Sequence, residues 1–151
     1  MLLALPYACG NIDSALLGED RSLVAMPASE ASGRAASIAA ADILPSRLLL
    51  LEDGHCLKNH ALAACKRPEL RVETAMLGTS LHTLVQMVDN GLGVTLLPQM
   101  ALEAGILDGT GVAALPLKSK DAHRCIAIAW RKASPRADEF RLLAKALKAA
   151  I

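Results

Sequence analysis

The fold is decided by the stretch Thr79-Ser-Leu-His-Thr-Leu-Val-Gln-Met-Val-Asp-Asn-Gly-Leu-Gly-Val-Thr-Leu-Leu-Pro98, where a helix pattern is followed directly by a strand pattern. The apolar residues of its first half are spaced i, i+3, i+4 and i+7, at Leu81, Leu84, Val85 and Val88. This spacing places them on one face of an amphipathic helix. Thr79 or Ser80 can cap the start of the helix, because either hydroxyl can accept a hydrogen bond from a free backbone N–H.

The second half of the stretch predicts a buried strand. Asn90-Gly91 supplies the left-handed residue at which the helix ends. The run Leu48–Leu51 earlier in the chain is continuously apolar, and we expect Val94–Leu97 to be another buried strand, closed by Pro98. Continuous apolar runs of this length are typical of strands that are covered on both faces.

Further elements extend this pattern in both directions. We expect strands over Met1–Leu5, Leu23–Met26 and Cys125–Trp130, a weak helix over Ser37–Ile43 and a helix over His55–Lys66. A last helix, capped at Ser134 with Pro135 at its first position, presents an apolar face of Phe140, Leu143, Ala144 and Leu147. Strands that alternate with helices predict an α/β fold with a mainly parallel sheet.

Composition excludes several classes of protein. The chain has 151 residues, 53% hydrophobic and 21% charged, with a formal net charge of +1, so it suits one folded domain rather than a disordered chain. Only 2% of its residues are aromatic. Because nucleic-acid binders need clustered positive charge, and single-strand binders add stacking aromatics, the chain by itself is not expected to bind DNA. No apolar run approaches the roughly 20 residues that span a membrane.

The segment around Cys56 concentrates reactive side chains. Cys56 follows a strand and a glycine turn, and it stands at the first turn of a predicted helix beside His55 and Lys58. Free backbone N–H groups and the positive end of the helix dipole favour a thiolate there. A thiolate is the nucleophile that attacks the O–O bond of a peroxide, and the product is a sulfenic acid.

Cys65 could capture such a sulfenic acid, but only after a change of structure. The two cysteines are nine residues apart, so an intact helix would separate them by about 13.5 Å and place them on opposite faces. A disulfide requires Cα atoms within about 7 Å. A Cys56–Cys65 disulfide would therefore require the helix between them to unwind, which is the behaviour of a redox switch.

Two other interpretations of this segment remain open. Most free cysteines are small buried apolar residues, and Cys56 could be one of them. His55, Cys56, His60 and Cys65 could also bind a metal, although only Cys56 and His60 share a helix face and the spacing is not that of a zinc finger.

The same segment resembles a known family. The run Leu51-Glu-Asp-Gly-His-Cys-Leu-Lys58 with Cys65 is similar to the regulatory domain of the peroxide-sensing LysR-type transcriptional regulators. The similarity continues through Thr79–Val88, Gly91–Pro98 and Arg124–Arg131. It thus covers nearly the whole chain, and the Gly-His-Cys motif with its second cysteine is its most specific part.

The resemblance implies roles for individual residues. Cys56 corresponds to the peroxide-reactive cysteine and Cys65 to the cysteine that resolves the sulfenic acid. His55 corresponds to the histidine beside the reactive thiol, and Arg124 to an arginine that helps to stabilise the thiolate.

The expected peroxide or effector pocket contains Thr79, Ser80 and Asn59, of which Thr79 and Ser80 belong to the helix start that lines the cavity between two lobes. Asn59 departs from the family, which usually has an acidic residue there. Cys125 is a second departure because it lies beside Arg124, although we interpret Cys125 and Cys9 as cysteines without a role.

The implied fold is the periplasmic-binding-protein-like effector domain of the family, with a complete second lobe and part of the first. Residues 1–19 would be a remnant of the first lobe and the crossover, residues 20–124 the second lobe with the redox cysteines, and residues 125–151 the return strand and helix of the first lobe. The winged helix-turn-helix domain that binds DNA in the family is expected to be absent from this sequence.

The implied function is the regulatory domain of a peroxide-sensing transcriptional activator, which is not an enzyme and uses no cofactor or metal. A reversible Cys56–Cys65 disulfide would remodel the domain and its dimer or tetramer. Hydrogen peroxide would be the small-molecule partner, a glutaredoxin- or thioredoxin-like protein the reductant, and the cytoplasm the location. Two alternatives stay open: a thiol peroxidase, and a ligand-binding LysR-type domain whose cysteines are incidental.

Overall fold

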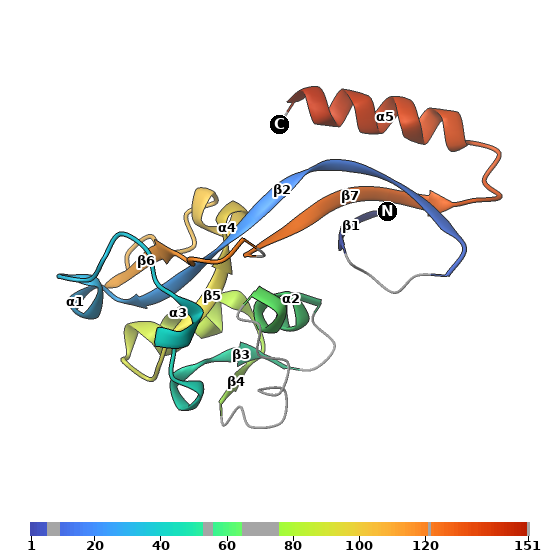
Figure 1. Cartoon of the computed structure of the whole chain (residues 1–151). Coiled ribbons are helices and arrows are strands. Elements are labelled where there is room, and N and C mark those ends of the chain that lie inside the picture. Colours follow the sequence, from blue (N-terminus) through green and yellow to red (C-terminus); the bar gives the residue numbers. More distant parts are fainter. Residues whose placement is uncertain (6–9, 53–55, 65–75, 121, 151) are drawn as a thin grey trace. The chain divides into compact units, whose positions relative to one another are not determined.

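The computed structural model describes residues 1–5, 10–52, 56–64, 76–120 and 122–150, and the chain divides into two compact units (Figure 1). The first unit comprises Met1–Asp20 with Arg124–Ile151, and the second comprises Arg21–His123. The elements are β1 (Leu2–Leu5), β2 (Ile12–Pro27), α1 (Ala28–Ala31), η1 (Ala40–Asp42), η2 (Pro45–Arg47), β3 (Leu50–Leu51), α2 (Cys56–Ala64), β4 (Leu77–Gly78), α3 (Leu81–Asp89), β5 (Thr95–Pro98), α4 (Gln99–Glu103), β6 (Val112–Pro116), β7 (His123–Arg131) and α5 (Ala137–Ala150). None of the helices in these described ranges is long and apolar enough to cross a membrane.

The first unit is a small antiparallel sheet with one helix. Strand β1 pairs with β7 from Leu2 opposite Ile128 to Leu5 opposite Cys125, and β7 in turn neighbours β2. Helix α5 runs along β2 and β7 (Figure 1), and Trp130 stacks on Phe140 of that helix with ring centroids 5.8 Å apart. The indole nitrogen of Trp130 is buried and has no hydrogen-bond partner among the described residues.

The second unit contains a mixed sheet. Strand β2 lies between β5 and β6 and is antiparallel to both. Beyond β5, a parallel bridge joins Leu48 to Val94, and β3 pairs in parallel with β4. The expectation of a mainly parallel sheet was therefore wrong. Parallel pairing is found between β3 and β4 and at two isolated bridges, Leu48 with Val94 and Ile38 with Leu117, whereas the long strand β2 pairs antiparallel with both of its neighbours in this unit.

The end of β2, residues 48–51 and β5 are buried on both faces. Along β2, Val24 and Met26 belong to one apolar core, whereas Ala25 between them belongs to another. The run 48–51 alternates in the same way, with Leu48 and Leu50 in the first core and Leu49 and Leu51 in the second. A sheet covered on both faces explains why these runs are continuously apolar.

Helix α3 confirms the pattern seen in the sequence. Ser80 is its N-cap, and Gly91, with φ of +74°, ends it in the left-handed region. Leu84, Val85 and Val88 are fully buried in the second core.

Two other predicted elements were wrong in detail. The expected helix over Ser37–Ile43 is a bridge residue followed by the short 3-10 turn η1. Helix α5 starts at Ala137, so Pro135 precedes it, and of its predicted apolar face Leu143 and Leu147 are exposed.

Among the described glycines of the second unit, Gly93 has the least room for a side chain. A Cβ at Gly93 would overlap the backbone carbonyl oxygen of Arg47, which already accepts a hydrogen bond from Val94 N at 2.8 Å. We expect Gly93→Ala to lower the free energy of unfolding by about 2 kcal/mol, because the backbone must shift to admit the methyl group. Urea unfolding followed by far-UV circular dichroism measures this change.

The matched control is Gly18→Ala, where nothing lies within 4 Å of an added Cβ. Its effect should stay within about 0.5 kcal/mol. Equal stability of the two variants would contradict the predicted overlap at Gly93.

Candidate functional site

Helix α2 begins at Cys56, shortly after the buried strand β3. The sequence predicted a helix that starts next to Cys56, and this start is confirmed. The N–H groups of a first helical turn have no partner within the helix, and the helix dipole is positive there. The backbone at Cys56 is therefore of the kind that stabilises a thiolate.

The described buried side chains of α2 are few, and one of them is a lysine. Lys58, Ala61 and Leu62, at positions i, i+3 and i+4, are exposed by only 3%, 5% and 3%. Asn59, the next residue after Lys58, faces solvent. Lys58 thus places a buried cation in the first turn of the helix that begins at Cys56.

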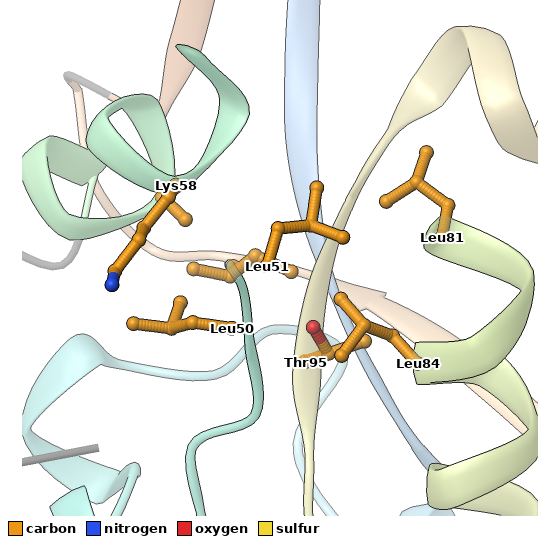
Figure 2. Close-up of a pocket in the computed structure, with 8 residues that line it drawn as sticks. Leu50, Leu51, Lys58, Leu81, Leu84 and Thr95 are labelled. Carbon is orange, nitrogen blue, oxygen red and sulfur yellow. The ribbon is translucent and has the colours of Figure 1, made fainter. Parts of the chain in front are cut away.

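Lys58 also lines a small pocket between α2, the sheet and α3. Figure 2 shows Lys58 on one side of this pocket, Leu81 and Leu84 of α3 on the other, and Leu51 between them. Thr95 closes the pocket with a hydroxyl that donates to Leu49 O at 2.9 Å. The cavity measures about 10 Å³, which is the space of a single water molecule (roughly 10–15 Å³) and too little for a larger ligand.

Thr79 and Ser80 lie at the start of α3 and are exposed. Ser80 Oγ accepts a hydrogen bond from Thr83 N at 3.1 Å and lies 3.0 Å from Thr83 Oγ1. Thr79 Oγ1 lies 3.4 Å from the same hydroxyl. These two residues and Asn59 do not line the small pocket beside Lys58, and their role in a peroxide pocket stays a prediction.

Arg124 lies in the first unit and is bonded to Asp20. Its Nε and Nη2 atoms are 2.8 Å and 2.7 Å from Asp20 Oδ2. The carboxylate side chain is only 1% exposed and the guanidinium 16%. In the structure this arginine therefore neutralises a buried carboxylate, and its predicted action on the Cys56 thiolate stays a prediction.

Three of the residues singled out in the sequence, His55, Cys65 and Cys9, lie outside the described residues. Cys125 is half-buried and free. Within the described ranges, no group of three or more His, Cys, Asp or Glu residues could hold a metal ion. The proposed metal set includes His55 and Cys65, so this finding does not test it.

Sequence reasoning missed the burial of Lys58 and the partner of Arg124. The helical spacing of Lys58 with Ala61 and Leu62 was a usable signal for the first, since all three share one face. No local signal pointed to the second, because Asp20 and Arg124 are 104 positions apart.

Comparison with known proteins gives consistent results. The sequence matches the family described as the LysR substrate binding domain over residues 1–151. It is 35% identical over 149 residues to the HTH-type transcriptional regulator EstR of Acinetobacter baylyi, covering 98% of this chain and 49% of that protein. It is 38% identical over 109 residues to the DNA-binding transcriptional dual regulator OxyR of Escherichia coli, covering 72% of this chain and 35% of OxyR.

Among solved structures, the reduced form of the regulatory domain of OxyR2 from Vibrio vulnificus matches with a TM-score of 0.87 and 35% identity. The match covers 99% of this chain and 70% of that domain. The chain thus spans about half or less of the length of the curated relatives named above. Both the sequence and the fold are those of a LysR-type regulatory domain.

The cap of α3 generates a prediction. Ser80→Ala removes the hydroxyl that accepts from Thr83 N, and we expect a loss of about 1 kcal/mol in the free energy of unfolding. Thr79→Ala is the control, because Thr79 meets only the exposed Thr83 hydroxyl and the described cap of the α3 backbone is Ser80, and its effect should stay within about 0.5 kcal/mol. Thermal unfolding of both variants measures the difference, and an equal loss in each would contradict the assignment of Ser80 as the cap.

The Asp20–Arg124 ion pair generates a second prediction. Arg124→Met leaves a carboxylate buried without its cation, and we expect the free energy of unfolding to fall by about 3 kcal/mol. The double variant Asp20→Asn, Arg124→Met should recover part of the loss because it buries no unpaired charge.

Urea unfolding at pH 7 tests both variants of this pair. Arg136→Met, which breaks an exposed ion pair with Glu139, serves as the control and should change little. A double variant as unstable as Arg124→Met alone would show that charge burial is not the cause.

Proposed function

This chain belongs to the LysR substrate binding domain family, and we propose that it is the regulatory domain of a peroxide-sensing transcriptional regulator. In this proposal Cys56 is the thiol that reacts with hydrogen peroxide. The observation that carries it is the position of Cys56 at the first residue of α2, where the backbone N–H groups of the first turn have no partner within the helix. Relatives with the name hydrogen peroxide-inducible genes activator support it.

The proposed chemistry needs one oxidant and two thiols. The Cys56 thiolate attacks one oxygen of hydrogen peroxide, the O–O bond breaks, and Cys56 becomes a sulfenic acid while hydroxide leaves and takes up a proton. The Cys65 thiol then attacks the sulfenic sulfur, which forms the disulfide and releases water. Two electrons pass from the pair of thiols to the peroxide, so the balance is complete.

Formation of this disulfide requires α2 to unwind. An intact helix holds residues nine positions apart too far from each other for an S–S bond. Two properties of α2 favour unwinding: it has nine residues, and Ala61 and Leu62 are its only fully buried apolar side chains among those described. A short helix with little buried apolar surface belongs to the part of a fold that opens most easily.

We further propose how the signal leaves the domain. Residues 20–124 would form the complete second lobe, with residues 1–19 and 125–151 contributing to the first. Refolding of α2 would change contacts within a homodimer or tetramer and so reposition DNA-binding domains of the winged helix-turn-helix type. A glutaredoxin- or thioredoxin-like reductant in the cytoplasm would restore the thiols. His55 beside the thiol, Arg124, and a pocket of Thr79, Ser80 and Asn59 would assist the reaction.

Mass spectrometry of peroxide-treated chain with blocked free thiols tests the proposal. We expect a peptide pair that joins Cys56 to Cys65. Cys65→Ser should stop at the sulfenic acid on Cys56, and Cys56→Ser should slow peroxide consumption roughly 100-fold because no activated thiolate remains.

Cys125→Ser is the matched control and should leave the linkage and the rate unchanged. A disulfide that involves Cys125, or an unmodified Cys56 after the added peroxide has been completely consumed, would overturn the proposal.

The match to EstR favours a second candidate, a LysR-type domain that responds to a bound small molecule. That relative covers 98% of this chain and its name mentions no peroxide. In this case Cys56→Ser would respond to its small molecule as the parent does.

Turnover distinguishes a thiol peroxidase from the proposed sensor. With an excess of a thioredoxin system, an enzyme keeps consuming peroxide at its initial rate, whereas the proposed sensor consumes about one equivalent before slow recycling.

A further inference from the structure

A second cavity lies in the Arg21–His123 unit, and none of its lining residues comes from α2 or α3. It is enclosed by the end of β2, helix α1, the two 3-10 turns and Val94. Its volume is about 70 Å³, several times the roughly 10–15 Å³ that one water molecule needs. The space is therefore enough for a short aliphatic group.

The floor of this cavity is entirely apolar. Five fully buried side chains form it, namely Val24, Met26, Ile38, Ile43 and Val94. Leu44 lies at the opening with 60% of its surface exposed. A branched hydrocarbon group that enters this cavity would be removed from contact with water. Burial of apolar surface contributes about 25 cal/mol per Å² to the free energy of binding.

Two of the four charged residues in the wall satisfy each other. Arg47 Nη1 and Nη2 donate to Glu30 Oε2 and Oε1 at 2.8 Å and 2.7 Å, a bidentate pair. The hydrogen bonds from Arg47 hold the pKa of Glu30 below its usual range. This pair closes one side of the cavity and has no net charge to offer a ligand.

The other two charged residues, Arg34 and Asp42, are not paired with each other. Arg34 Nε donates to the backbone oxygen of Glu30 at 3.1 Å, which leaves both terminal nitrogens of its guanidinium without a partner among the described residues. Asp42 Oδ2 accepts from Ala39 N at 3.3 Å, which leaves Oδ1 available. Both side chains line the cavity and both reach solvent.

We propose that this cavity binds a small aliphatic α-amino acid. The carboxylate of the ligand pairs with Arg34, its ammonium pairs with Asp42, and its side chain fills the apolar floor. Arg34 helps to lower the pKa of Glu30, but the salt bridge within 4 Å in this wall is that of Glu30 with Arg47. The wall thus presents one cation, Arg34, and one anion, Asp42, outside that bidentate pair. Such a wall matches a zwitterion better than a simple acid or amine, because either of the latter would face one charge of its own sign. The inference does not depend on the reactivity of Cys56.

Isothermal titration of the chain with L-leucine tests this site. We expect saturable binding with one ligand per chain. Arg34→Gln and Asp42→Asn should each weaken it about 10-fold or more, the effect of losing one charge-assisted hydrogen bond. The analogues 4-methylpentanoate, which lacks the ammonium, and 3-methylbutylamine, which lacks the carboxylate, should both bind more weakly than leucine.

Arg136→Gln is the control, because it removes an exposed arginine from the other unit and should bind leucine as the parent does. Thermal unfolding of Arg34→Gln and Asp42→Asn checks that both variants are folded, as their exposure predicts. Absence of saturable leucine binding, unchanged affinity in both variants, or equal affinity for an analogue with a single charge would each overturn the proposal.

Discussion

The strands of the Arg21–His123 unit must satisfy two apolar cores at once, and the rest of that unit depends on this constraint. Successive side chains along β2, along residues 48–51 and along β5 point alternately into the two cores. A slip of one residue in any of them would exchange every side chain between the cores. The same alternation determines which helix covers which face, with Ala61 and Leu62 of α2 in one core and the apolar face of α3 in the other.

Features of the fold that depend on residues within one short stretch could be predicted from the sequence, whereas features that depend on distant residues could not. Helix α3 was predictable because its cap, its apolar spacing and Gly91 all fall within one short stretch. The start of α2 at Cys56 was predictable for the same reason. The antiparallel pairing of β2 was not, since it depends on strands far along the chain, and neither was the Asp20–Arg124 pair. Leu143 is exposed although its spacing placed it on the apolar face of α5, because helical spacing alone does not show which apolar residues pack against a neighbouring element.

Helices α2 and α3, beside the candidate site, differ in how many described side chains they bury. Helix α3 buries Leu84, Val85 and Val88 and has a side-chain cap, whereas the described side chains of α2 include two buried apolar residues and a buried lysine. Burial of one such large side chain contributes about 1.5–3 kcal/mol, so α3 is anchored more firmly by the apolar contacts alone. The cysteine proposed to react with peroxide thus begins the helix with fewer described apolar contacts, next to a helix that is packed more firmly.

The fluorescence of Trp130 reports on only one of the two units of this molecule. It is the only tryptophan of the chain, and it lies in the first unit, enclosed by Phe140 and with the guanidinium of Arg141 6.0 Å from its ring centre. Cys56 belongs to the other unit. Emission from the indole therefore reports on the surroundings of α5 within the first unit. A shift in the wavelength of this emission upon oxidation would mean that the structural change had spread beyond the unit that contains Cys56.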